Sequence, residues 1–217
     1  MPIPENYKPE IPLTAKDRAF AQIQEWIIDG TLMPGEKIND MELARAIGVS
    51  RTPVREAIML LSMQGLISTR PGVATYVEDA RIEDMEKLLP PSAALQSLAA
   101  EIATPLMTEH HIALMEEANQ GLADALERHD FFNALKFDTQ FHRVIINLCD
   151  NSYLTNALDN LQAHVRRLFY LNTTIISENS VKEHAELIQA IREKDPSKAS
   201  TLAKKHWTRS VEDFMNL

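Results

Sequence analysis

The sequence predicts a mostly α protein, in which a small N-terminal unit of short helices and a hairpin precedes an all-α antiparallel helical bundle. Apolar residues make up 45% of the 217 positions, which is enough for a sizeable core. Apolar and charged residues alternate at helical spacing through much of the chain, and glycine is scarce, with 6 residues. Strand-like patterns occur only near residues 66–78, so the one expected hairpin belongs to the N-terminal unit.

Three segments are expected along the chain. Residues 1–12 are polar and proline-rich and predict a flexible arm, residues 13–79 form the first unit, and residues 80–217 form the bundle. The arm has no signal-peptide core, and no apolar run approaches the ~20 residues that span a membrane. One cysteine, Cys149, excludes an internal disulfide and suits a reducing compartment. We therefore expect a cytoplasmic protein without a membrane partner.

Helix-capping residues and glycine stops divide the N-terminal unit into short elements. Ser, Thr and Asp accept hydrogen bonds from the first free N–H groups of a helix, and glycine readily ends one. The pair Pro71-Gly72 between two strand-like runs predicts the turn of a small hairpin, or wing. The expected elements are a helix over 15–29 capped by Thr14, a helix over 41–47 capped by Asp40, a helix over 52–64 capped by Ser50, and strands over 66–70 and 74–78.

Prolines and polar breaks divide the remaining chain into the helices of the bundle. Pro90-Pro91 is expected to kink or interrupt the path into the bundle, because proline lacks the N–H group that an α-helix needs. The helices are long enough, and the breaks between them short enough, for neighbouring helices to run antiparallel. The expected helices cover residues 82–89, 92–104, 108–128, 130–149, 151–175, 180–194 and 196–215.

The charge balance is unfavourable for a general polyanion binder. The chain has 22 Lys and Arg residues against 31 Asp and Glu residues, a net charge of −9. A nucleic-acid-binding surface usually carries an excess of basic residues. Bulk charge therefore argues against nonspecific attraction to nucleic acid, and any DNA recognition has to come from a local motif.

The N-terminal unit contains such a motif. A helix-turn-helix places the first side chains of its second helix in the major groove of DNA, and the tight turn at 48–50 provides this layout. Arg51 and Arg55 lie one turn apart at the leading end of the following helix, where arginine can read guanine or hold a phosphate. The hydroxyls of Ser50 and Thr52 can reach phosphates or base edges. These four side chains are the candidate DNA contacts.

Each of these features alone also has a purely structural interpretation. Ser50 can act only as a helix cap, and Arg55 can pair with a nearby carboxylate such as Glu42 or Glu56. The combined helix-turn-helix and wing favours DNA binding. Four ordered pieces carry the pattern: Pro34-Gly35-Glu36-Lys37-Ile38, Glu42-Leu43-Ala44, Gly48-Val49-Ser50-Arg51-Thr52-Pro53-Val54-Arg55-Glu56-Ala57 and Gly65-Leu66-Ile67.

These pieces resemble the winged helix of GntR-type bacterial regulators. The resemblance implies that Arg51, Thr52 and Arg55 contact operator DNA, together with Gly72 at the tip of the wing. Many relatives carry arginine where this chain has Met41, and their wings have basic residues where it has Val73-Ala74. We therefore expect this winged helix to make fewer contacts to DNA than those relatives make.

The bundle contains a candidate metal site. Asp138 and His142 lie at i and i+4, so one helical face carries a carboxylate and an imidazole between apolar residues. His184 and His206 lie on two other expected helices, each beside an apolar stripe. Such a set suits a divalent metal buried in a bundle. A histidine on a helix is more often structural, so the spacing alone leaves both interpretations open.

The region matches a second family pattern in Asp138-Thr139-Gln140-Phe141-His142, Asn151, Glu183-His184-Ala185-Glu186-Leu187-Ile188-Gln189-Ala190-Ile191 and Ala203 to His206. These pieces resemble the FCD ligand-binding domain of FadR-type GntR regulators. In metal-containing members, one Asp and three His residues bind a divalent ion, which implies Asp138, His142, His184 and His206 as ligands. Zn²⁺ is the expected ion, with Ni²⁺ and Mn²⁺ as alternatives.

The same resemblance implies a small carboxylate effector, an organic acid or a sugar acid, at an open position of the metal. Relatives often carry Arg and Glu in the first long helix of this domain, where this chain has Ser92 and Gln96. The missing arginine removes a bidentate clamp for a carboxylate. Arg166 and Arg167 are the candidate replacements, and the alternative for each is a solvent-facing side chain.

Together these patterns predict a sequence-specific DNA-binding transcriptional regulator, with repression as the commoner arrangement in the family. A two-fold homodimer would read a palindromic operator, and a small metabolite would control its affinity for DNA. One alternative keeps the regulator without a metal and gives it an apolar or acyl effector. The other alternative is a metal-dependent hydrolase, but no convincing general base lies beside the site, so we expect no enzyme.

Overall fold

The computed structural model describes residues 14–70, 74–172 and 178–215. The expected arm over 1–12 and the wing-tip Gly72 lie outside the described residues. None of the helices in the described ranges combines the length and the apolar character that a membrane span requires.

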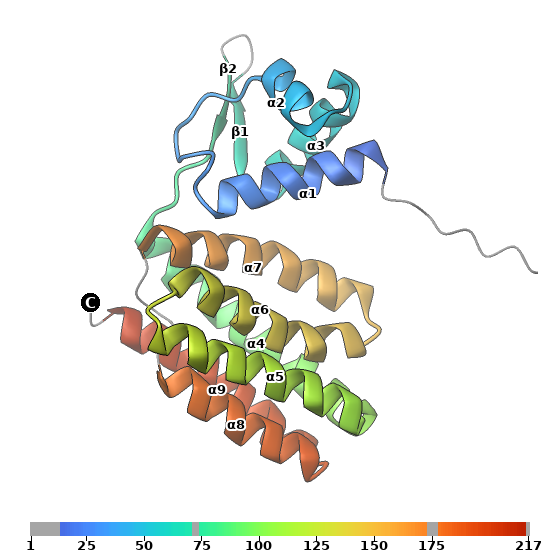
Figure 1. Ribbon diagram of the computed structural model, residues 1–217, viewed down its shortest axis with the longest axis vertical. Helices are drawn as coiled ribbons and strands as arrows, with labels where there is room; N and C mark the ends of the chain where they lie inside the picture. The colour runs from blue at the N-terminus through green and yellow to red at the C-terminus, as the bar shows by residue number, and fades with distance from the viewer. Residues whose placement is uncertain (1–13, 71–73, 173–177, 216–217) are drawn as a thin grey trace, which may run out of the picture. The chain divides into compact units, whose positions relative to one another are not determined.

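The smaller of two compact units comprises Met1–Ile27 and Thr31–Asp79. Its strands pair antiparallel, with Ile67 opposite Val77 (Figure 1). Apolar side chains on the inner faces of its helices, together with Leu66 between α3 and β1, are fully buried and form its core; those of the helices include Ile23, Ile27, Val54, Ala57 and Leu61. The elements are α1 (Ala15–Ile28), α2 (Asp40–Ile47), α3 (Arg51–Met63), β1 (Ile67–Arg70) and β2 (Ala74–Val77).

The N-terminal cap of α1 agrees with the prediction, and that of α2 differs from it. The Thr14 hydroxyl accepts from the Asp17 N–H, and the Asp17 carboxylate accepts from the Thr14 N–H, so α1 begins where expected. Asp40 is not the cap of α2, as the sequence had predicted. Asn39 takes the extended backbone before the helix and accepts from the Met41 N–H at 3.0 Å. The Asp40 carboxylate is therefore left for other partners.

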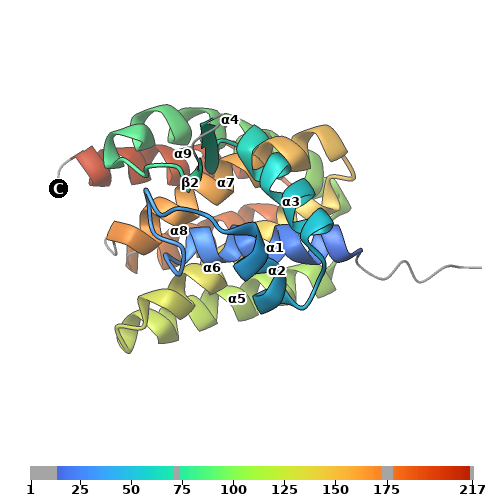
Figure 2. The same ribbon diagram turned by 90° about the horizontal axis from the view of Figure 1, so that it is seen from above.

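The larger unit, Ile28–Gly30 with Ala80–Leu217, is a helical bundle. α4 and α9 lie side by side in two perpendicular views (Figures 1 and 2), and α5 packs against α6 and α8. Its central core includes Met115, Phe141, Ile145, Leu158 and Ile188. The elements are η1 (Ile82–Asp84), α4 (Met85–Ala103), η2 (Thr104–Leu106), α5 (Glu109–Glu127), α6 (Phe131–Leu148), α7 (Ser152–Asn172), α8 (Glu178–Arg192) and α9 (Pro196–Met215).

The predicted break at Pro90-Pro91 is wrong, because α4 runs without interruption from Met85 to Ala103 through both prolines. Proline removes a hydrogen bond to the carbonyl four residues earlier, which here belongs to Glu86 and Lys87. Both prolines and both of these residues are exposed, so water can reach the carbonyls that lose their donors. The flanking residues Leu89 and Ser92 are buried, and their packing holds the helix together across the prolines.

Candidate metal centre and nucleic-acid interface

Three helices of the larger unit bring four potential metal ligands together. α6 supplies Asp138 and His142, α8 supplies His184, and α9 supplies His206, and one donor atom from each lies within 4.8 Å of the others. The four residues are between 1% and 8% exposed. The sequence related only Asp138 and His142 by spacing, and the fold adds the two histidines that lie far along the chain.

Two of the potential donor atoms in the cluster are buried without partners in the part of the chain that the structure describes. The Nε2 atoms of His142 and His184 are buried and have no hydrogen-bond partner among the described residues. They lie 4.0 Å and 3.7 Å from the two carboxylate oxygens of Asp138. Buried polar atoms without partners are costly, and three imidazole nitrogens with one carboxylate are a donor set that divalent transition metals prefer. The residues therefore fit a divalent ion.

A second set of side chains orients the imidazoles from behind. The Nδ1 atom of His184 lies 3.1 Å from Oδ1 of Asn119 on α5, and the Nδ1 atom of His206 lies 2.8 Å from Oε2 of Glu183 on α8. Because both oxygens can only accept, each Nδ1 donates, and in the neutral ring of His184 the lone pair lies on Nε2, where a ligand can use it. The ring of Phe141 stacks on His184 with 3.7 Å between the centroids.

Burial dominates the electrostatics of the cluster. It raises the pKa of Asp138 to about 6, against the opposing charges of His206 and Arg209. Burial also lowers the pKa values of His142 and His184 well below the usual range, so both imidazoles are neutral near pH 7. Above pH 6 the site thus offers an ionised Asp138 carboxylate and the neutral imidazoles of His142 and His184, the protonation states that bind metals.

Glu183 has the opposite balance. Burial tends to raise its pKa, but hydrogen bonds with His206 and Arg209 outweigh burial and lower the pKa to about 2. The Nε atom of Arg209 donates to Oε1 of Glu183 at 2.7 Å. Glu183 is therefore a permanently charged support for His206.

Sequence reasoning missed Asn119 and Glu183 as parts of this site. Glu183 carried no reliable signal, because it immediately precedes the candidate ligand His184, whereas the fold places it behind His206 on α9. Asn119 carried none, because it lies on α5 with no fixed spacing to His184, and only tertiary packing brings the two together.

The candidate effector arginines lie on α7. Arg167 is 1% exposed, so the solvent-facing alternative is wrong for this residue, whereas Arg166 is half-buried. Ser92 and Gln96 on α4 are also buried. The Ser92 hydroxyl donates to the Leu88 carbonyl, and the Gln96 amide nitrogen has no partner among the described residues. The interior of the unit thus holds polar groups outside the metal cluster.

The smaller unit presents the four described DNA-contact candidates at the start of α3. Ser50 occupies the N-cap position, but its side chain makes no capping hydrogen bond. Ser50, Arg51, Thr52 and Arg55 are all exposed. Arg55 pairs with Asp40, neither with Glu42 nor with Glu56 as the structural alternative had it, and Arg51 pairs with the same carboxylate.

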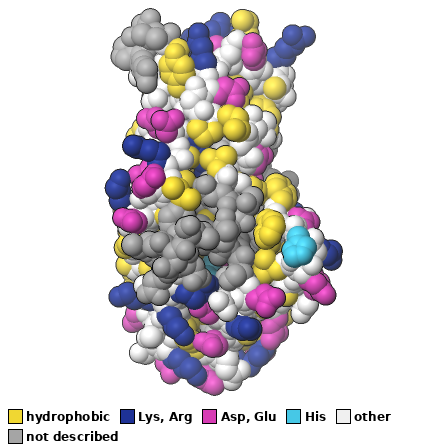
Figure 3. Space-filling model, turned by 90° about the vertical axis from the view of Figure 1, so that its left-hand side faces the viewer, with side chains coloured by type: hydrophobic (Ala, Val, Ile, Leu, Met, Phe, Trp, Pro, Cys, Tyr) yellow, Lys and Arg dark blue, Asp and Glu magenta, His cyan; other side chains and the backbone are white. Residues whose placement is uncertain are grey.

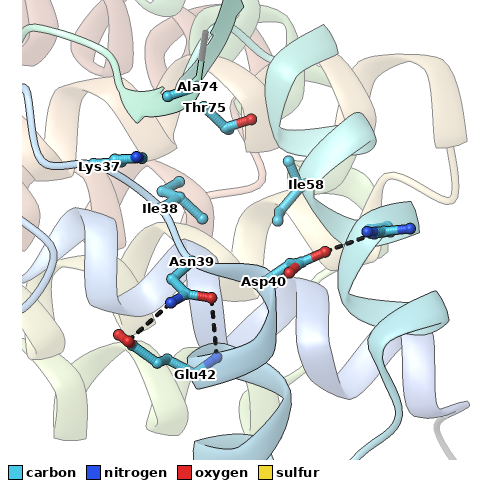
Figure 4. A pocket seen from close by; sticks show the side chains of 9 residues that line it. Lys37, Ile38, Asn39, Asp40, Glu42, Ile58, Ala74 and Thr75 are labelled. Atoms are coloured by element: carbon cyan, nitrogen blue, oxygen red, sulfur yellow. Dashed lines mark hydrogen bonds and ion pairs between the residues drawn. The ribbon is translucent and has the colours of Figure 1, made fainter. Parts of the chain in front are cut away.

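Charges of both signs mix on the surface. On the face drawn in Figure 3, Lys and Arg side chains are interspersed with Asp and Glu side chains. A groove of about 690 Å³ lies beside the start of α3, and Figure 4 shows side chains from α2, α3 and β2 around it. Both signs also meet here, because Lys37, Asp40, Glu42 and Arg55 all line this groove.

Two family models match the chain. The model of the gntR family of bacterial regulatory proteins matches residues 15–77, and the model of the FCD domain matches residues 92–209, more than half of the chain. The chain belongs to the GntR family. GntR regulators with an FCD domain are DNA-binding transcriptional regulators and not enzymes, so the prediction of a regulator is confirmed at this level.

Similar proteins agree with this assignment. The HTH-type transcriptional regulator YdhC of Bacillus subtilis is 23% identical over 216 residues, covering 98% of this chain and 96% of YdhC. The HTH-type transcriptional repressor RspR of Escherichia coli is 26% identical over 171 residues, covering 78% of this chain and 75% of RspR. The structure of E. coli McbR/YncC has a TM-score of 0.82 at 20% identity, covers 94% of this chain and 99% of its own, and has the same fold.

Proposed function

We propose that this GntR-family regulator is a repressor that binds operator DNA as a homodimer, and that a small carboxylate, bound at a divalent-metal site, weakens this binding. One observation carries the metal site: the buried Nε2 atoms of His142 and His184 lack partners among the described residues and lie beside the Asp138 carboxylate. A regulator responds to an effector only when the two states of the protein bind it with different affinity.

In this proposal Asp138, His142, His184 and His206 hold the ion, with Zn²⁺ preferred and Ni²⁺ or Mn²⁺ as alternatives. A bound ion supplies a buried positive charge, which attracts an anionic effector such as an organic acid or a sugar acid. Arg166 and Arg167 on α7 are the candidates for a second contact to the carboxylate. Arg167 is 1% exposed, so a contact to an effector there would lie in the interior of the larger unit.

On the DNA side, Ser50, Arg51, Thr52 and Arg55 contact the operator in this proposal, with Gly72 at the wing tip assigned by family resemblance alone. A homodimer doubles these contacts on a palindromic site. In this proposal the larger unit supplies most of the subunit interface. Light scattering tests the assembly, and the expected mass is twice the 24.5 kDa of one chain.

Metal analysis of the purified protein tests the central claim. We expect about one divalent ion per chain, and His184→Ala abolishes it because the site loses a buried ligand. His110→Ala is the matched control, since His110 is exposed and outside the cluster, and it retains the ion. Wild-type protein without metal, after exposure to Zn²⁺, contradicts the proposal and favours the regulator with an apolar or acyl effector.

A binding assay tests the control by carboxylates. A duplex selected by the wild-type protein from a random library serves as the operator, and fluorescence anisotropy measures its affinity. Organic acids and sugar acids are added one at a time at fixed Zn²⁺, and we expect at least one to weaken DNA binding. If none changes the affinity, the effector part of the proposal is wrong, whatever the metal content.

A further inference from the structure

The Asp40 carboxylate lies between two arginines that the proposed function assigns to DNA contact. Arg51 donates through Nη2 to both carboxylate oxygens, at 3.0 Å and 3.1 Å, and Arg55 donates through Nε at 2.6 Å. The arginine side chains are 52% and 64% exposed, whereas Asp40 is only 21% exposed. Figure 4 shows the Asp40 carboxylate pointing from the start of α2 toward α3.

The atoms used by these ion pairs determine which donors remain. Asp40 binds Arg55 through Nε, so Nη1 and Nη2 of Arg55 make no hydrogen bond to the described residues. A pair of N–H groups of this kind forms the fork that reads O6 and N7 of guanine. Arg51 is held through Nη2 instead and keeps Nε and Nη1 for other acceptors. The two arginines are therefore presented differently to DNA.

We propose that Asp40 is a positioning residue for DNA recognition, which orients Arg51 and Arg55 toward base edges and keeps them from clamping phosphates. The inference rests on the proposed function, in which these arginines contact the operator. The positive charges of Arg51 and Arg55, one helical turn apart, repel each other. Asp40 offsets that repulsion and holds the two guanidinium groups in one arrangement. Its carboxylate also repels any phosphate that approaches the pair.

Two further observations support this role of Asp40. The hydrogen bond from Arg55 lowers the pKa of Asp40, so the carboxylate is ionised at neutral pH. The chain as a whole carries a net charge of −9, which already disfavours nonspecific DNA. Asp40 extends this discrimination to α3 itself. Its carboxylate neutralises part of the positive charge of Arg51 and Arg55, which would otherwise attract the phosphates of any DNA.

The test compares the selected duplex with a scrambled duplex of the same length and composition. Asp40→Asn removes the charge, and we expect the ratio of the two dissociation constants to fall about tenfold, mainly through tighter binding of the scrambled duplex. The slope of log affinity against log salt for the scrambled duplex becomes steeper by about 1. Glu42→Gln is the matched control, because Glu42 lies on the same helix and hydrogen-bonds Asn39 instead of an arginine.

The ratio of the two dissociation constants decides the outcome, and the affinity for either duplex alone does not. If Asp40→Asn and Glu42→Gln change both duplexes by the same factor, Asp40 acts only through net charge, and the positioning role is wrong while the proposed function stands. If Arg51→Ala and Arg55→Ala leave both affinities unchanged, the proposed DNA contacts fail, and the positioning role fails with them. Melting curves verify folding, and Asp40→Ser replaces Asp40→Asn if the latter is unfolded at the assay temperature.

Discussion

Asp138 is a carboxyl group buried among imidazoles, and burial raises its pKa to about 6. A raised pKa means that the metal-free folded protein holds this proton until the pH exceeds about 6. Metal binding needs the ionised carboxylate. Below that pH, binding therefore has to displace the proton of Asp138, whereas above it the carboxylate is already ionised. We expect the affinity for Zn²⁺ to change little from pH 7 to 8 and to fall at least about tenfold per pH unit below 6.

Competition with a chromophoric chelator across this pH range measures the effect. Asp138→Asn is the control, because it removes the titrating group. Below pH 6, the slope of the logarithm of the Zn²⁺ affinity against pH should decrease by about 1 in this variant. His142 and His184 contribute little to the slope, because burial lowers their pKa values well below the usual range. An affinity for Zn²⁺ that stays constant between pH 5 and 7 would contradict a protonated Asp138.

The predictability of the site differs from residue to residue. Spacing along one helix placed Asp138 and His142 together, because the helical repeat alone does so. His184 and His206 entered through family resemblance, since no local pattern relates residues on separate helices. Arg167 shows the limit of local reasoning, because two adjacent charged residues are typical of a surface, and only the packing of α7 buries one of them.

At the scale of elements, three helices end in an unusual way. His129, Asp150 and Lys194 follow α5, α6 and α8 with φ angles of 54°, 45° and 54°, in the left-handed region that favours glycine. A side chain costs about 1 kcal/mol in this conformation. Asp150 is exposed, so Asp150→Gly should increase the free energy of unfolding by about 0.5–1 kcal/mol, measured by urea denaturation.

Lys194→Gly provides the contrast for this prediction. The Lys194 ammonium donates hydrogen bonds to the carbonyls of Thr104 and Met107. Glycine at this position would remove the backbone strain but also these two hydrogen bonds, which tie the end of α8 to η2. We expect no stabilisation from Lys194→Gly. Equal stabilisation by both substitutions would show that the hydrogen bonds of Lys194 contribute nothing to stability. Destabilisation by Asp150→Gly would refute the argument from backbone strain.

The elements themselves were largely predictable, since helical periodicity and caps such as Thr14 identify them locally. The failures have physical causes. Asp40 looked like a cap, but the preceding Asn39 has the same capping chemistry, and tertiary ion pairs engage Asp40. Pro90 and Pro91 looked like a break, but exposure of the affected carbonyls and burial of Leu89 and Ser92 allow α4 to continue.

At the scale of the whole molecule, the sequence predicted a DNA-binding regulator despite its acidic balance. The charge argument and the motif argument pointed in opposite directions, and the family assignment agrees with the motif. Acidic and basic side chains are neighbours in the fold, because Asp40 and Glu42 line the same groove as Arg55 on α3. Composition could not reveal this, since it carries no information about which charges are neighbours.

The deep burial of the four candidate ligands also affects how fast the protein can respond to metal supply. With exposures between 1% and 8%, we expect an ion to exchange only when the helices that carry the ligands move apart locally. The rate of removal by a chelator should then level off at high chelator concentration, at the rate of this opening. In the proposed site, an ion would therefore exchange at the rate of this opening rather than at the rate of diffusion.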